Sequence, residues 1–206
     1  MVSVPRLLPN GGTAVCNGTG PSLTREDAES CRGRVLVVAV NDAHLYAPWA
    51  DVLYASDADW WQVHKGVPSF AGLKYSCSKP AASVQGVQVL RQTGHDGLEL
   101  DPTGLRTGRN SGAAALNLAV LLGATRILLL GYDCGQTGKQ EHFFGPHRQG
   151  LRNRSPYGLF RQHFATMVGP LKSAGVSVLN CSRETQLTCF PRGDLREALG
   201  VKEQAA

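Results

Sequence analysis

Short runs of apolar residues alternate along the chain with longer segments in which apolar residues recur at helical spacing. Residues 34–40 (RVLVVAV) and 126–131 (RILLLG) are nearly continuous apolar runs, which are typical of parallel strands buried on both faces. Residues 13–16, 51–55 and 176–180 are predicted to form further short strands. The alternation of strands with helices predicts an α/β fold: an open, mostly parallel Rossmann-like sheet with helices on both faces.

The helical segments are marked by their composition and their ends. Residues 110–123 (NSGAAALNLAVLLG) are the clearest helix, because Ala and Leu are strong helix formers and Gly123 suits the C-terminal end. The other predicted helices are one opened by Thr24 and ended by Gly33, one over residues 57–65, one over residues 157–174 with a kink or break at Pro170, and a turn at residues 194–199.

The remaining segments are less regular. Residues 70–76 and 84–90 are compatible with strands, residues 95–107 are predicted as loop, and residues 132–155 form a long polar loop of the kind that is often functional. The length of 206 residues favours a single domain. Its core is expected over about residues 13–180, with flexible ends at 1–10 and 201–206.

Composition narrows the class of protein. The net charge of +5 permits a nucleic-acid partner, but the Lys and Arg residues form no run that would favour one. The six cysteines lack C-x-x-C spacing, which argues against a zinc site and a disulfide scaffold. No stretch approaches the roughly 20 apolar residues of a membrane span, and the start lacks the apolar core of a signal peptide. A cytoplasmic protein without a membrane partner is expected.

A glycine-rich loop follows the first predicted strand and precedes a helix. In this context backbone N–H groups and a helix N-terminus bind phosphate, although a plain strand-to-helix turn gives the same pattern. The loop is not a Walker A motif, and Leu23 stands where a dinucleotide fingerprint needs a third glycine. Asp42 after the second strand would suit a ribose, which keeps a nicotinamide cofactor as an alternative. The predicted phosphate-binding residues are Gly18, Thr19, Gly20, Pro21 and Ser22.

Polar residues also follow the other predicted strands or open the Ala-rich helix. The carboxyl ends of parallel strands meet at one edge of the sheet, where ligands bind in open α/β folds. Helix capping explains any one of these residues equally well. The expected pocket residues are Asn41, Asp42, Ser56, Asp57, Asn110, Ser111, Gly112, Gly131, Tyr132 and Asp133.

The long loop carries a basic stretch over residues 139–154 (KQEHFFGPHRQGLRNR). His147, or failing it His142, is a candidate general base, and Arg148 is a candidate phosphate ligand. A solvated basic loop is the alternative interpretation. The other four histidines, His44, His64, His95 and His163, are predicted to be structural, and Trp49, Trp60 and Trp61 are predicted to serve packing.

The motifs G-T-G-P-S-L, N-S-G at a helix start and G-Y-D at a strand end, followed by a Gly/His loop, carry a resemblance. The chain resembles the Rossmann-like group of bacterial sialyltransferases, motility-associated flagellin glycosyltransferases and archaeal 6-hydroxymethylpterin diphosphokinases. It resembles most the small phage proteins of that group that are labelled norphogenetic protein. The resemblance covers most of residues 13–180, and would place the protein in the cytoplasm of an infected bacterium.

The resemblance implies that the first loop and Asn41 contact a nucleotide, with Ser56 and Asp57 nearby, that Ser111 and Gly112 approach a phosphate or sugar, and that His147 deprotonates an acceptor hydroxyl. The chain departs from the sialyltransferases at three places. Thr19 replaces an Asn, Pro146 separates His147 from its Gly, and the tyrosine pair that assists the leaving group has no match, since Gly135 stands at its first position and Tyr132 and Tyr157 lie elsewhere.

The sequence therefore favours a transferase that uses a nucleotide-activated donor such as a sugar nucleotide, in particular a glycosyltransferase. One alternative is a diphosphokinase that requires Mg²⁺, for which Asp57 and Asp133 are the candidate ligands. Another is a nucleotide-binding protein without turnover. The acceptor and the oligomeric state stay open.

Overall fold

A computed structural model describes residues 2–136, 140–145 and 155–201. In this part of the chain seven strands form one sheet in the order β5-β4-β3-β2-β1-β8-β9, and every neighbouring pair is parallel. The strands are β1 (Thr13–Asn17), β2 (Leu36–Val40), β3 (Val52–Tyr54), β4 (Leu73–Ser76), β5 (Val87–Val89), β8 (Arg126–Leu130) and β9 (Ser177–Asn180).

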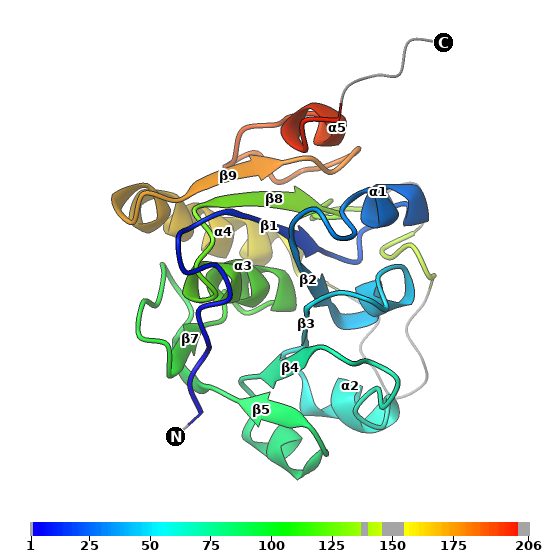
Figure 1. The fold of residues 1–206 in the computed structure, drawn as a ribbon, viewed down its shortest axis with the longest axis vertical. Coiled ribbons are helices and arrows are strands. Elements are labelled where there is room, and N and C mark those ends of the chain that lie inside the picture. The colour runs from blue at the N-terminus through cyan, green and yellow to red at the C-terminus, as the bar shows by residue number, and fades with distance from the viewer. Residues whose placement is uncertain (1, 137–139, 146–154, 202–206) are drawn as a thin grey trace.

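Helices cover both faces of the sheet, as Figure 1 shows. The helices α3 (Ser111–Leu121) and α4 (Tyr157–Ser173) pack on the face that carries Ala14, Cys16 and Leu129. The opposite face, with Val15 and Leu128, is covered by α1 (Arg25–Ser30), α2 (Ala58–Val63) and α5 (Leu195–Ala198), together with the 3-10 helix η1 (Asn41–Leu45). The predicted α/β, Rossmann-like architecture is confirmed.

The strand order reverses direction at β1. The chain passes from β1 outward through β2, β3, β4 and β5, and then returns to place β8 on the other side of β1. In open parallel sheets such a reversal opens a crevice at the carboxyl ends of the two central strands. The fold therefore places the loops after β1 and β8 side by side, and it brings the start of α3 to the same edge.

One expectation about local structure is wrong. Residues 95–107 are not loop throughout, because β7 (Gly104–Arg106) pairs in parallel with β6 (Arg91–Gly94). The side chain of Asn117 in α3 fixes this segment, because its oxygen accepts hydrogen bonds from the main-chain N–H groups of Glu99 and Arg106. Asn117 lies outside β7 in the sequence. The residues of β7 themselves therefore give no indication that this contact will order them as a strand.

Of the kink or break predicted at Pro170, the break is absent: α4 runs continuously from Tyr157 to Ser173. Phe164, Met167 and Leu171 are buried on both sides of the proline and anchor both halves of the helix. Their packing offsets the loss of one main-chain hydrogen bond at the proline. The remaining 3-10 helix, η2 (Lys79–Ser83), lies between β4 and β5.

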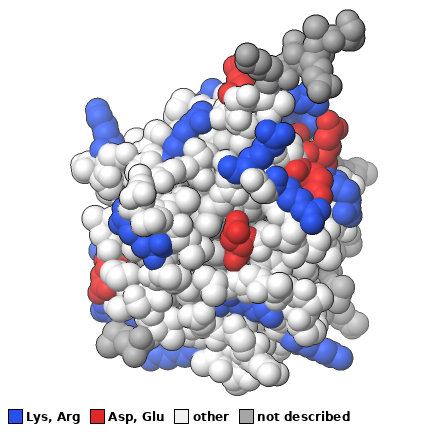
Figure 2. All heavy atoms as spheres, in the orientation of Figure 1, with Lys and Arg blue, Asp and Glu red and all other residues white. Residues whose placement is uncertain are grey.

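Surface charge is dispersed on the face seen in Figure 2. Lys and Arg side chains are scattered there and mixed with Asp and Glu, without a continuous basic surface on that face. Among the described residues, no helix combines the length and apolar character that crossing a membrane requires.

Candidate functional site

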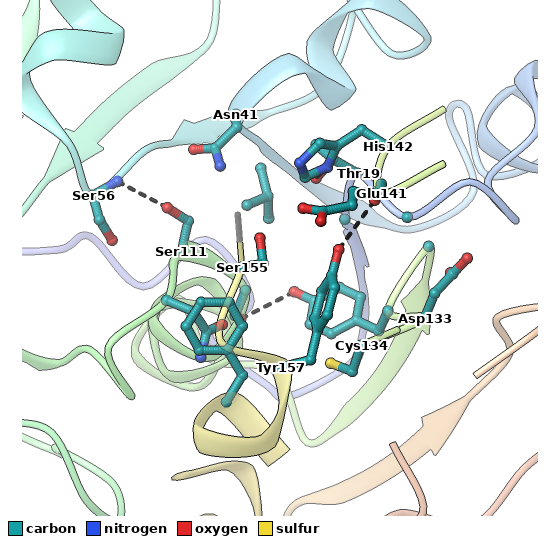
Figure 3. Close-up of a pocket in the computed structure, with 18 of the residues that line it drawn as sticks. Thr19, Asn41, Ser56, Ser111, Asp133, Cys134, Glu141, His142, Ser155 and Tyr157 are labelled. Carbon is teal, nitrogen blue, oxygen red and sulfur yellow. Dashed lines mark hydrogen bonds between the residues drawn. The ribbon is translucent and has the colours of Figure 1, made fainter. Parts of the chain in front are cut away.

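A cavity of about 500 Å³ lies at the carboxyl edge of the sheet, beside the reversal between β1 and β8. This volume falls in the range of small-molecule sites. Figure 3 shows side chains from distant parts of the chain facing this space. The predicted pocket residues that line it are Gly18, Thr19, Gly20, Asn41, Ser56, Asp57, Asn110, Ser111, Gly112, Gly131, Tyr132, Asp133 and His142.

The first loop (residues 18–22) contributes Gly18, Thr19 and Gly20 to the lining, but the main-chain N–H groups of both glycines are already used inside the protein. Gly18 N donates to Leu130 O at 2.7 Å and Gly20 N to Gly131 O at 2.8 Å. These bonds fasten the loop to the end of β8. Since those N–H groups point at protein carbonyls, they are not available to a phosphate in this conformation.

The last donor of the first loop is bound by a carboxylate of the protein. Ser22 donates from its main-chain N to Asp133 Oδ2 at 2.8 Å and from its Oγ to Asp133 Oδ1 at 2.6 Å. Asp133 is only 3% exposed, and burial raises the pKa of its carboxyl above the usual value against the opposing effect of these hydrogen bonds. Asp133 thus occupies the position that an external anion would need. Pro21 and Ser22 do not line the cavity.

The start of α3 (residues 109–112) differs from the first loop because it faces the cavity with donors. Asn110 caps the helix by accepting from Ala113 N at 2.8 Å, whereas the N–H groups of Ser111 and Gly112 have no acceptor within the helix by geometry. Arg109 also lines the cavity and adopts a left-handed φ of 53°. A helix N-terminus attracts anions.

Two strand ends fix the start of α3 in place. Ser56 N, at the end of β3, donates to Ser111 Oγ at 3.1 Å. Tyr132, which follows β8, donates its hydroxyl to Gly112 O at 3.0 Å, and a Cβ on Gly112 would meet the tyrosine ring at 3.0 Å. The hydrogen bond between Ser56 and Ser111 is drawn in Figure 3. The helix start is therefore held rigidly against the sheet edge.

Two predicted site residues, Asn41 and Asp42, follow β2, and they have different roles. Asn41 lines the cavity with a left-handed φ of 49°. Asp42 does not line it: the carboxylate is buried, accepts from Trp60 Nε1 at 2.9 Å and pairs with His64 Nε2 at 3.2 Å. Burial alone would raise the pKa of Asp42, but the hydrogen bonds from His64 and Trp60 hold it below its usual value. A ribose contact by Asp42 is incompatible with this placement.

His142 reaches the cavity from the segment of residues 140–145. Its Nδ1 lies 3.1 Å from Thr19 Oγ1, and its ring stacks on Phe144 with centroids 5.0 Å apart. Phe143 secures the segment, since its N donates to Thr19 O at 3.1 Å and its ring stacks on Tyr46. His147 and Arg148 lie outside the described residues.

The structure adds lining residues that the sequence did not indicate. Trp60, expected to serve packing alone, reaches the cavity wall although it is only 3% exposed. Tyr157 at the start of α4 donates its hydroxyl to Glu141 O at 3.4 Å, and burial together with the charge of Glu141 raises its pKa to about 12. The other additions are Val40, Asp59, Arg109, Cys134, Gly135, Glu141, Ser155, Pro156, Phe160 and Phe164.

Charge is unevenly distributed around the described part of the wall. Its described lining residues include one arginine, Arg109, and four carboxylates, those of Asp57, Asp59, Asp133 and Glu141. Among the described residues, no group of three or more His, Cys, Asp or Glu is arranged to hold a metal ion. Burial raises the pKa of Cys134 to about 12, so its thiol is not ionised near neutral pH and is a poor nucleophile.

No family model, curated protein or solved structure matches the chain in the comparisons with known proteins. The interpretation of the site therefore depends on its geometry.

Proposed function

We propose that this protein is a transferase that binds a nucleotide-activated donor, with a sugar nucleotide as the donor and a hydroxyl compound as the acceptor. One observation carries the proposal: one cavity at the sheet reversal is lined by the start of α3, by Arg109 and by His142. This combination supplies the two elements of such a transfer, a phosphate site and a proton acceptor.

The donor phosphates are assigned to the start of α3. The N–H groups of Ser111 and Gly112 and the guanidinium of Arg109 would hold them, and would stabilise the negative charge that develops on the leaving phosphate. Asn41 and the main chain of Gly18 and Gly20 are left to contact the nucleoside. The first loop thereby shapes the cavity instead of binding phosphate.

His142 is assigned as the base. It would take the proton of the acceptor hydroxyl while the acceptor oxygen bonds to the sugar carbon and the bond from that carbon to the donor phosphate breaks. Thr19 fixes the orientation of the ring through Nδ1. The resemblance assigns this role to His147 instead, and that residue is compared in the same experiment.

Turnover of a panel of sugar nucleotides, followed by mass spectrometry of released nucleotide, tests the proposal. His142→Ala should lower kcat by at least about 100-fold, a usual contribution of a general base. Gln140→Ala, an exposed position of the same segment that does not line the cavity, is the control and should match the wild type. If kcat falls strongly in His147→Ala but not in His142→Ala, then His147 is the base and the assignment of His142 is wrong. Absence of any turnover by the wild type refutes the proposal.

A second candidate is Mg²⁺-dependent diphosphate transfer, which the carboxylates of Asp57 and Asp59 on the wall favour. Divalent cations bind carboxylate oxygen and substrate phosphates together. Loss of turnover on chelation, restored by Mg²⁺ and abolished in Asp57→Asn, would identify this reaction. Turnover that chelation leaves unchanged excludes it.

A further inference from the structure

The carboxylate of Glu141 lies at the cavity wall, and the proposed transfer reaction assigns it no role. Glu141 precedes His142 in the segment of residues 140–145. Figure 3 shows its side chain directed into the cavity, in the space between His142 and Tyr157. Its position beside the assigned base raises the question of what it binds.

The two oxygens of this carboxylate differ. Oε1 accepts a hydrogen bond from Gln136 Nε2 at 3.0 Å, which fixes the side chain. Oε2 is buried and has no hydrogen-bond partner among the described residues. A buried carboxylate oxygen without a donor is unfavourable, and in native proteins such a group is commonly satisfied by water or a ligand.

Two neighbouring polar groups are directed elsewhere. The Tyr157 hydroxyl donates to the main-chain oxygen of Glu141, not to its carboxylate. Nδ1 of His142 lies against Thr19 Oγ1. The carboxylate is therefore held in position by Gln136, while one of its oxygens receives no donor from the described part of the chain, as expected of a group that receives one from a bound molecule.

We propose that Glu141 Oε2 accepts a hydrogen bond from a hydroxyl of the acceptor and orients that acceptor beside His142; the inference rests on the transferase function proposed above. It also limits the acceptor class. A negatively charged carboxylate repels a carboxylate or phosphate group at this point, so the acceptor presents a neutral, hydroxyl-rich face. The donor phosphates are assigned instead to the start of α3, where Arg109 also lines the cavity.

The test compares Glu141→Gln with Glu29→Gln, an exposed glutamate of α1 outside the cavity. Glutamine keeps the size of the side chain and an acceptor for Gln136 but removes the charge. In the protein without ligand, Glu141→Gln should raise the melting temperature by about 2–4 °C, because an unsatisfied buried charge is removed. Glu29→Gln should leave it unchanged. A structural role for Glu141 predicts a fall instead.

The second measurement uses the sugar nucleotide that the wild type turns over, with neutral methyl glycosides and the corresponding methyl uronides as acceptors. Glu141→Gln should raise the KM for the neutral acceptor at least about 10-fold, the value of a hydrogen bond to a charged group, with the donor KM unchanged. The wild type should prefer neutral over acidic acceptors, and the variant should lose that preference. An unchanged acceptor KM or a lowered melting temperature overturns the inference about Glu141 alone. Lack of wild-type turnover instead refutes the transferase function, and the inference with it.

Discussion

The first loop and the start of α3 are both short, Gly- and Ser-containing segments that meet at one sheet edge, and they differ in where their donors point. In the first loop, Gly18, Gly20 and Ser22 donate to carbonyls and to the carboxylate of Asp133. At the start of α3, Asn110 caps the third N–H, the first two have no acceptor within the helix, and Arg109 also lines the cavity. The first segment is closed by internal bonds and the second is open to a ligand. A glycine-rich turn before a helix is thus an anion site only where the protein supplies no anion of its own.

The largest expected effect concerns the open segment. Arg109→Gly removes the guanidinium while glycine tolerates the left-handed φ of 53°, so folding should be unaffected. Affinity for the tightest binder among CMP, UDP, GDP and ADP should fall about 10- to 100-fold, measured by isothermal titration. Arg91→Gly, at an exposed residue away from the cavity, is the control. Unchanged affinity in Arg109→Gly would remove the phosphate site from α3.

The next effect concerns the closed segment. A Cβ at Gly20 would overlap the Asp133 carboxylate, so Gly20→Ala should lower the free energy of unfolding by about 1–3 kcal/mol. Chemical denaturation measures this change. Gly145→Ala is a comparison for glycine replacement as such, although its own φ of 85° introduces backbone strain. A Gly20→Ala variant as stable as the wild type would show that the closure by Asp133 is not rigid.

A smaller effect distinguishes a first loop that is bonded to Asp133 from one that binds phosphate. Ser22→Ala removes one hydrogen bond to Asp133 and should lower the free energy of unfolding by about 1 kcal/mol. Its nucleotide affinity should stay within about twofold of the wild type, because Ser22 does not line the cavity. If the serine hydroxyl binds phosphate, affinity drops in this variant as much as in Arg109→Gly.

The smallest effect is a pH dependence of the closed segment. The pKa of Asp133 is raised in the folded protein by burial, so its contribution to stability is full below about pH 4, its unfolded value, and is lost as pH rises through the raised pKa. Asp133→Asn does not titrate. The free energy of unfolding of the wild type minus that of the variant should therefore decrease as pH rises from about 4 through the raised pKa. An increase over this range contradicts the assignment.

The sequence was sufficient for the sheet and for the edge at which the cavity lies. Continuous apolar runs identified β2 and β8, and the polar residues after them, such as Asn41 and Asp133, follow from the geometry of parallel strands. What each residue binds was not predictable. The contact of Asp133 with Ser22 joins positions 111 residues apart, and no local pattern distinguishes it from a free carboxylate.

The same limit explains the residues that sequence reasoning missed. Glu141 and Tyr157 lie in or beside an irregular loop, where periodicity does not indicate which way a side chain points. Trp60 is predicted to be a core residue because most of its side chain is buried in the core. Asp42 shows the converse error. Its position after a strand is typical of a ribose-binding residue. In the structure, however, both oxygens of Asp42 are hydrogen-bonded inside the protein, one to Trp60 of α2 and the other to His64 at the end of that helix.

The central claim is that a nucleotide binds in this cavity with its phosphates on the start of α3. A crystal structure with a nucleoside diphosphate bound tests it most directly. We predict phosphate oxygens within hydrogen-bond distance of the N–H groups of Ser111 and Gly112 and of the Arg109 guanidinium, with the Asp133–Ser22 bonds intact. Phosphate seated on the first loop with Asp133 displaced, or nucleotide bound outside the cavity, would contradict the account.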